Sequence, residues 1–166
     1  MSKKISKKEQ KKDEKNEKND VEIKKESDEK KNEFTGVTLK EMQIALDIGA
    51  KLILWNNKEY VDIRRYERGF PTKRGIMMER NVFKKLQEID FNNLERTKDV
   101  KNEGDKYAKE IKSVFINENI KVSLLLYKEK EYVDIRKYYN NYPTKKGLRV
   151  YKATFLKIVE LDFEKF

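Results

Sequence analysis

The chain has 166 residues, of which 42 % are charged, and its formal net charge is +10. It contains neither cysteine nor histidine, which excludes disulfides, zinc–thiolate sites and histidine-based acid–base chemistry. No segment approaches the roughly 20 apolar residues that cross a bilayer, and we expect no secretory signal, so the basic balance points to nucleic acid or an acidic membrane surface.

Residues 1–33 combine 12 lysines with 10 acidic residues, and all 18 aromatic residues of the chain follow them. Their large aliphatic side chains are limited to Ile5, Val21 and Ile23. Such a segment cannot bury enough apolar surface to offset the entropy cost of ordering, so it is predicted to be a disordered charged tail. We favour a solvated arm that aids solubility, and a weak electrostatic tether for nucleic acid is the alternative.

Two structures are open for the segment from Phe34 to Ile48. Alignment with the later stretch Val114-Phe115-Ile116 favours a strand near Met42 to Leu46. The apolar residues from Leu39 to Leu46 fit a short helix equally well.

A recognisable series of elements begins at Ala50. An apolar run ends in an aromatic residue at Trp55, and a polar turn leads into a strand from Tyr60 to Tyr66 that is rich in β-branched and aromatic residues. Because side chains alternate across a strand, Val61 and Ile63 share one face, and tyrosines and charged residues share the other. One face is therefore expected to be buried, and the other to stay polar and aromatic.

Pro71 is expected to break this strand, because proline lacks the N–H group that a β-ladder needs. The segment Pro-Thr-Lys-Arg-Gly would then form a basic turn before a short third strand at Ile76 to Met78. Apolar residues at helical spacing predict a helix from about Arg80 to Phe91 that covers the apolar face of the sheet. The polar residues 92–111 suit a linker.

The same series recurs after an offset of 72 residues. Glu59 to Phe91 and Glu131 to Phe163 share 16 identical residues in 33 aligned positions, which duplication explains and chance does not. The second copy therefore predicts a strand at Tyr132 to Tyr139, a short strand at Leu148 to Tyr151, and a helix from Lys152 to Phe163.

Three features that occur in both copies suit nucleic-acid binding. The Asp-Ile-Arg triplets at 62–64 and 134–136 form either a surface salt bridge or an arginine that is oriented to grip a phosphate. The Pro-Thr-basic-basic-Gly segment is either an ordinary solvated turn or a phosphate-binding loop in which glycine allows close approach. Exposed aromatic residues beside cations offer stacking platforms for unpaired bases, worth roughly 1–3 kcal/mol per base.

The segment KEKEYVDIRKYYNNYPTKKGL joins a lysine-rich turn, an Asp-Ile-Arg strand with aromatic residues, and the basic segment before glycine. In this pattern each copy resembles the C-terminal domain of the positive-cofactor-four transcriptional coactivator family, over about Met42 to Phe91 and Val114 to Phe163. The resemblance implies a curved four-stranded antiparallel sheet followed by one helix. It also implies a dimer whose sheets form channels for single-stranded DNA. For two copies in one chain, we predict an α+β fold of two tandem β-β-β-β-α modules that form an intramolecular pseudo-dimer.

Carried over position by position, the resemblance assigns binding roles to strand-end aromatics, turn lysines, strand arginines and the basic pairs before each glycine. The implied nucleic-acid-binding residues are Trp55, Arg64, Lys73, Arg74, Tyr127, Lys128, Lys130, Arg136, Tyr139, Lys145 and Lys146. The first copy has Glu67 where the second has Tyr139, so we expect weaker binding by the first copy.

The predicted organisation is a tail at 1–33, a first module at 34–91, a linker at 92–111 and a second module at 112–166. The leading hypothesis is sequence-independent binding of single-stranded DNA, in transcription or in protecting unwound DNA, with RNA as the alternative ligand. Components of the transcription machinery are further expected partners, a membrane is not, and homo-oligomers of the fused pair are an open alternative. The expected location is the cytoplasm or nucleoid in a bacterium or phage, and the nucleus in a eukaryote.

Two other classes of protein are alternatives. An enzyme is not expected: the alternative of a carboxylate–metal nuclease is disfavoured because each of its acids lies beside a lysine or arginine. Those acids are Glu59, Asp62, Glu131 and Asp134. A purely structural scaffold is the last alternative. No cofactor, metal site or catalytic residue is predicted.

Overall fold

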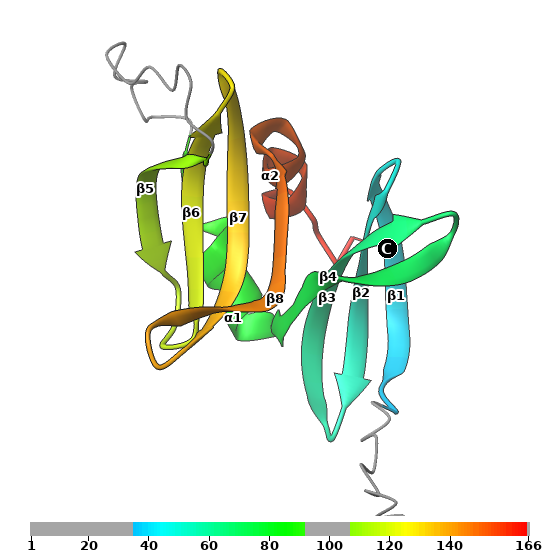
Figure 1. Ribbon diagram of the computed structural model, residues 1–166. Helices are drawn as coiled ribbons and strands as arrows, with labels where there is room; N and C mark the ends of the chain where they lie inside the picture. Colours follow the sequence, from blue (N-terminus) through cyan, green and yellow to red (C-terminus); the bar gives the residue numbers. More distant parts are fainter. Residues whose placement is uncertain (1–34, 92–106, 166) are drawn as a thin grey trace, which may run out of the picture. The chain divides into compact units, whose positions relative to one another are not determined.

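The two repeated segments fold into two four-stranded antiparallel sheets, each followed by one helix (Figure 1). The computed structural model describes residues 35–91 and 107–165. The first module consists of β1 (Val37–Ala45), β2 (Ile48–Trp55), β3 (Lys58–Glu67), β4 (Phe70–Glu79) and α1 (Arg80–Gln87). The second consists of β5 (Lys109–Phe115), β6 (Ile120–Tyr127), β7 (Lys130–Tyr139), β8 (Tyr142–Tyr151) and α2 (Lys152–Val159). The strands follow chain order in each sheet, so the predicted fold class is confirmed.

The predicted domain boundaries can be compared with these elements. The proposed tail at 1–33 and most of the proposed linker lie outside the described residues. β5 begins at Lys109, three residues before the start that we predicted for the second module. Of the two structures left open for 34–48, the strand is observed and the helix is wrong. Leu46 is fully exposed, so the apolar residues there do not form the single buried face that a helix would need.

Two-residue turns set the register of the central hairpins. Asn56-Asn57 and Lys128-Glu129 all have positive φ, between 47° and 61°, as a type I′ turn requires. The turns place Trp55 opposite Lys58, and Tyr127 opposite Lys130. Each strand-end aromatic is therefore held beside a lysine at the tip of its hairpin.

Pro71 and Pro143 do not break their strands, and that prediction was wrong. Each is the second residue of a ten-residue strand, β4 or β8, which extends well beyond the short strands predicted after the glycine. Both strands lie at the edge of their sheet, where a missing N–H group leaves no partner unsatisfied. The chain reverses earlier, at Arg68-Gly69 and Asn140-Asn141, where φ is positive.

Both helices end four residues before their predicted ends, at Gln87 and Val159. The prediction placed each end at the last apolar residue, but Phe91 and Phe163 are buried from the non-helical segments that follow. No helix in the described part of the chain is long and apolar enough to cross a membrane.

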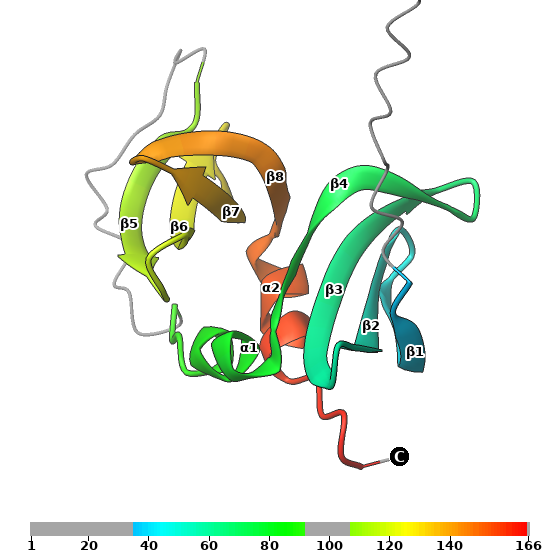
Figure 2. The same cartoon turned by 90° about the horizontal axis from the view of Figure 1, so that it is seen from below.

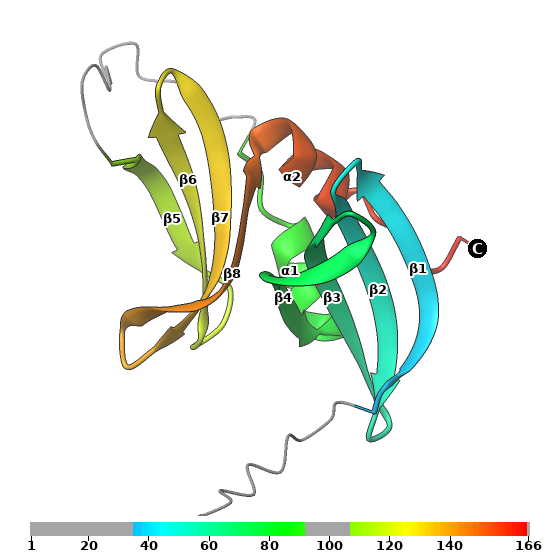
Figure 3. The ribbon, with the colours of Figure 1, turned by 45° about the vertical axis from the view of Figure 1, so that its right-hand side comes forward.

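The apolar faces of both sheets and both helices contribute to one core. The described residues, 35–91 and 107–165, belong to one unit, and several contacts within it join the modules. The rings of Phe83 and Phe163 meet edge to face at 5.9 Å between centroids, and those of Phe91 and Phe155 lie 5.5 Å apart. The Gln87 amide donates to the carbonyl oxygens of Val159 and Leu161, at 3.0 and 2.8 Å. Figures 2 and 3 show α1 and α2 side by side, as these contacts require.

Candidate nucleic-acid interface

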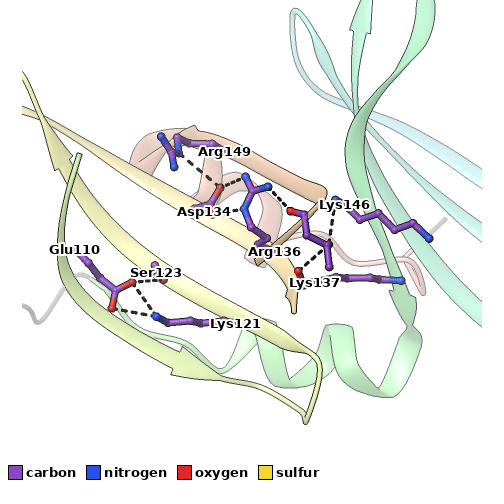
Figure 4. Close-up of polar contacts among 9 residues, drawn as sticks. Glu110, Lys121, Ser123, Asp134, Arg136, Lys137, Lys146 and Arg149 are labelled. Carbon is purple, nitrogen blue, oxygen red and sulfur yellow. Dashed lines mark hydrogen bonds and ion pairs between the residues drawn. The ribbon is translucent and has the colours of Figure 1, made fainter. Parts of the chain in front are cut away.

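The face of each sheet that points away from the core, here called the outer face, carries the aspartate and the arginine of the Asp-Ile-Arg triplet, whose isoleucine is in the core. In the second module Arg136 donates from Nε and Nη2 to the two carboxylate oxygens of Asp134, at 2.8 and 2.9 Å, and from Nη1 to the Thr144 carbonyl oxygen at 2.8 Å (Figure 4). The hydrogen bond with Asp134 raises the pKa of Arg136. Asp134 is only 8 % exposed, so the arginine is fixed in one orientation by a nearly buried acid.

The first module repeats this arrangement with Arg64, Asp62 and the Thr72 carbonyl oxygen, at 3.0, 3.0 and 2.7 Å. The salt bridge weighed from the sequence is therefore present in both copies. It does not exclude a role in binding, because a guanidinium has more N–H groups than these contacts use. The modules differ at one neighbour: Arg149 Nε lies 3.6 Å from Asp134, whereas Met77 is paired with Asp62 in the first sheet.

The basic segment before each glycine forms a β-bulge rather than the predicted turn. Thr72, Lys73 and Arg74 lie opposite Arg65 alone, between the pairs Arg64–Gly75 and Tyr66–Pro71. We call Thr72 to Arg74 the first bulge, and Thr144 to Lys146, in the same position of β8, the second bulge.

A threonine closes each bulge. Thr144 Oγ1 donates to the Lys137 carbonyl oxygen at 2.8 Å and accepts from the Lys146 backbone N–H at 3.2 Å. Thr72 makes the same two contacts in the first bulge. Both residues that follow the threonine in each bulge are exposed. Each bulge thus presents two cations from an ordered backbone.

The glycine after each bulge makes room for the arginine. A Cβ atom at Gly147 would lie 2.9 Å from the Ile135 carbonyl oxygen and 3.1 Å from Arg136 Cζ. The interpretation in which this glycine allows a ligand to approach is therefore replaced by one in which it allows the Arg136 side chain to cross β8.

We expect Gly147→Ala to lower the free energy of unfolding by about 1–3 kcal/mol, as overpacking does, and to weaken nucleic-acid binding because Arg136 is displaced. Denaturant unfolding and a binding titration measure the two effects. Gly75→Ala is the matched control, since its Cβ would meet Ile63 and Arg64 in the same way. Equal stability with unchanged binding in Gly147→Ala would show that the glycine does not position the arginine.

Aromatic rings lie near both ends of β7. At one end Tyr132 and Tyr151 stack with centroids 4.9 Å apart, and Lys128 Nζ lies 5.2 Å from the centroid of the Tyr127 ring. At the other end Tyr139 and Tyr142 are 72 % and 75 % exposed, beside the turn between β7 and β8. These exposed rings are available for stacking with unpaired bases.

Between these ends lies a second set of polar contacts. Lys121 Nζ is 5.7 Å from the centroid of the Tyr138 ring and 3.0 Å from Glu110 Oε2, which also accepts from Ser123 (Figure 4). Burial acts to raise the pKa of Glu110, but hydrogen bonds from Lys121, Ser113 and Ser123 outweigh it and lower that pKa. The first module has Gly49 where the second has Lys121, so its outer face lacks this cation.

A groove of about 810 Å³ adjoins the second bulge. Its cationic and aromatic lining comes from Lys137, Tyr138, Tyr139, Lys145 and Lys146, and Tyr60 and Glu79 line it from the first module. Lys137 is half-buried and makes no ion pair within the described residues. Burial and the neighbouring Lys146 lower the pKa of Lys137, against a smaller opposing effect of Asp62.

Replacing Lys137 with methionine is expected to stabilise the free protein at neutral pH and to weaken nucleic-acid binding. A lysine whose pKa falls on folding makes the folded state bind fewer protons than the unfolded state, so wild-type stability rises as the pH approaches the ordinary value of 10.5. The stability advantage of Lys137→Met should therefore shrink toward that pH. Thermal unfolding of both proteins from pH 7 upward measures this difference, and an advantage that does not change with pH would contradict it.

The four acids of the nuclease alternative are each held by a cation. Asp62 and Asp134 are paired with Arg64 and Arg136. Glu59 accepts from Arg80, and Glu131 Oε2 lies 3.2 Å from Lys152 Nζ. No group of three potential metal ligands occurs within residues 35–91 and 107–165.

Comparison with known proteins finds a match in the second module. Residues 115–161 match the family model described as Transcriptional Coactivator p15 (PC4). The match covers all of β6, β7, β8 and α2, and so includes the second Asp-Ile-Arg triplet and the second bulge. The second module is therefore similar to a transcriptional coactivator domain. No curated protein matches the chain.

The eleven residues predicted from the sequence fall into two groups in each module. Trp55, Tyr127, Lys128 and Lys130 lie at the β2–β3 and β6–β7 hairpin tips. The others lie on β3, β7 and the two bulges, with Tyr139 at the end of β7. They are Arg64, Lys73, Arg74, Arg136, Tyr139, Lys145 and Lys146. The structure brings Tyr139, Lys145 and Lys146 together along one groove.

Sequence reasoning missed three cations of the second module: Lys121, Lys137 and Arg149. The prediction followed the positions of the family pattern, which does not include these three. At the same positions the first copy has Gly49, Arg65 and Met77. The signal that reveals them is the reverse one, a position at which the second copy gains charge relative to the first. Gly49 against Lys121 and Met77 against Arg149 are the two clearest cases.

Proposed function

We propose that the chain binds single-stranded DNA without sequence preference, through the outer face of the second module and the second bulge. One observation carries the proposal: the exposed ring of Tyr139 meets lysines that make no ion pair within residues 35–91 and 107–165, along the groove beside β7 and β8. The similarity of residues 115–161 to a transcriptional coactivator family supports a role in transcription, where unwound DNA and the transcription machinery are present together.

The proposed contacts divide by chemistry. Lys145 and Lys146 at the second bulge, with Lys137 beside them, attract phosphates. Lys128 and Lys130 do the same at the hairpin tip. Phosphate contacts set the position of a strand and carry no sequence information. Arg136 is held rigidly enough by Asp134 to offer its remaining N–H groups to one phosphate.

The bases are proposed to stack on the exposed rings. Tyr139 is the best placed of them, because it lines the groove together with the bulge lysines. Tyr127, the last residue of β6, offers a second platform at the hairpin tip, with Lys128 over its ring. Every base has a face that can stack, so this recognition tolerates any sequence but needs bases that are not paired.

In the first module the corresponding residues Trp55, Arg64, Lys73 and Arg74 are proposed to bind more weakly. The fused modules are proposed to replace the two subunits of a dimer, because the core and the Gln87 contacts already join them within one chain. A solution mass of 20.0 kDa, that of one chain, is expected.

A competition between strands tests the proposed function. Labelled oligothymidylate bound to the full chain is displaced by unlabelled single-stranded DNA, by duplex of the same sequence, or by matched RNA. We expect single-stranded DNA to compete at least tenfold better than duplex. RNA should compete about as well as DNA, because stacking and phosphate contacts do not read the 2′-hydroxyl. Equal competition by duplex would reject the proposal. A large preference for RNA would show that RNA, and not DNA, is the ligand.

A further inference from the structure

The two bulges are alike in backbone and in their own cations, but acids surround only the first. At the first bulge Glu67 Oε1 lies 3.9 Å from Arg74 Nη1, and Asp47 pairs with Arg65. The corresponding residues of the second module are Tyr139 and Asn119, which carry no charge. Arg65, Lys73 and Arg74 thus have two acids among them. Lys137, Lys145 and Lys146 make no ion pair within the described residues.

The hairpin tips repeat the difference. Lys58 Nζ lies 3.7 Å from Glu79 Oε1 in the first module. In the second, Tyr151 occupies the position of Glu79 and stacks on Tyr132, and Lys130 makes no ion pair in the described part of the chain. The first module therefore has carboxylates, Glu67 and Glu79, at two positions where the second has tyrosine rings.

These acids affect the binding of phosphates through their charge, and they contribute little to the stability of the fold. The side chains of Glu67 and Arg74 are mostly exposed, and such pairs contribute little to folding. At physiological ionic strength, however, charges act over about 8 Å. A carboxylate this close to Arg74 cancels most of its attraction for a phosphate. Glu67 also removes the stacking surface that Tyr139 supplies in the other copy.

We infer that each chain holds one nucleic-acid strand, at the second bulge, and that Glu67 keeps a second strand off the first bulge. This inference rests on the proposed function, and it assigns Glu67 as the residue that makes the two halves unequal. A protein built from two copies of one binding module thereby presents a single strand-binding site. The first module then serves to complete the core and to line one side of the groove with Tyr60 and Glu79.

The number of strands per chain tests the inference. The full chain is titrated with an oligothymidylate of about eight nucleotides, within the range of known strand-binding sites, at protein concentrations well above the dissociation constant. Native mass spectrometry of the same mixture gives the composition of the complex. We expect one strand per wild-type chain and a second strand on the Glu67→Tyr variant. Two equivalent strands on the wild-type chain would overturn the inference, and absence of any binding would instead reject the proposed function.

Paired variants identify the bulge that binds. Lys145→Ala/Lys146→Ala should weaken binding about tenfold or more, and Lys73→Ala/Arg74→Ala less than about threefold, because Arg74 is already paired with Glu67 and releases fewer counterions on binding. Equal losses would contradict the inference. Glu67→Gln removes the charge without adding a ring and is safe for folding, since the side chain is exposed. If Glu67→Gln and Glu67→Tyr both fold, by circular dichroism, and both hold one strand, Glu67 does not exclude the second.

Discussion

Replacement of Arg136 by methionine is expected to remove most single-strand binding and to lower the free energy of unfolding by about 2–3 kcal/mol. The methionine leaves Asp134, which is nearly buried, without its main partner. The loss falls at the low end for a broken buried ion pair because Arg149 still lies 3.6 Å away. Strand binding fails because the second bulge also loses the hydrogen bond from Arg136 to the Thr144 carbonyl oxygen.

The matched variant Arg64→Met separates the two effects. Asp62 has Met77 rather than a second arginine opposite it, so the stability loss should be at least as large as for Arg136→Met. Binding should change much less, since Arg74 of the first bulge is already paired with Glu67. Urea unfolding and oligothymidylate titration of both variants measure this. Equal binding losses in the two variants would contradict the assignment of the site to the second module.

Replacement of Phe155 by alanine is expected to cost about 3–5 kcal/mol, the usual loss for a buried aromatic side chain. Phe155 is fully buried and its ring contacts that of Phe91, which follows the helix of the other module. Because the two modules share one core, the loss should lower a single thermal transition, on the order of 10 °C, rather than split it.

Differential scanning calorimetry distinguishes one transition from two. Leu46→Ala is the control, because that side chain is fully exposed and its removal should leave the melting temperature nearly unchanged. Two transitions, of which only one moves in Phe155→Ala, would show that the modules fold independently and that the contacts between them are incidental.

The fold follows from the sequence where alternation is strong. Val61 and Ile63 are buried as alternation requires, and the duplication extends the same reasoning to the second module. The reasoning failed at Pro71, because a proline is harmless on an edge strand and strand order is set by the whole sheet. It failed again at the helix ends, since Phe91 is buried by tertiary packing that no local periodicity records.

Part of the candidate site could also be predicted from the sequence. The Asp-Ile-Arg triplet and the basic pair were found because both copies retain them. Lys137 was not found, because its setting depends on Asn119, which stands in the turn between β5 and β6 where the first module has Asp47. Contacts between distant segments decide whether a lysine is neutralised. Whether a lysine is paired with an acid cannot be read from the sequence unless the position of that acid in the fold is known.

Photo-cross-linking of oligothymidylate to the full chain, followed by peptide mapping, tests most directly whether a single strand lies on the second module. We expect cross-links on peptides that contain Tyr139, Tyr142 and the lysines of the second bulge, and their loss when unlabelled single strand is added in excess. Cross-links confined to peptides from residues 35–91, or spread evenly over the two modules, would contradict the account.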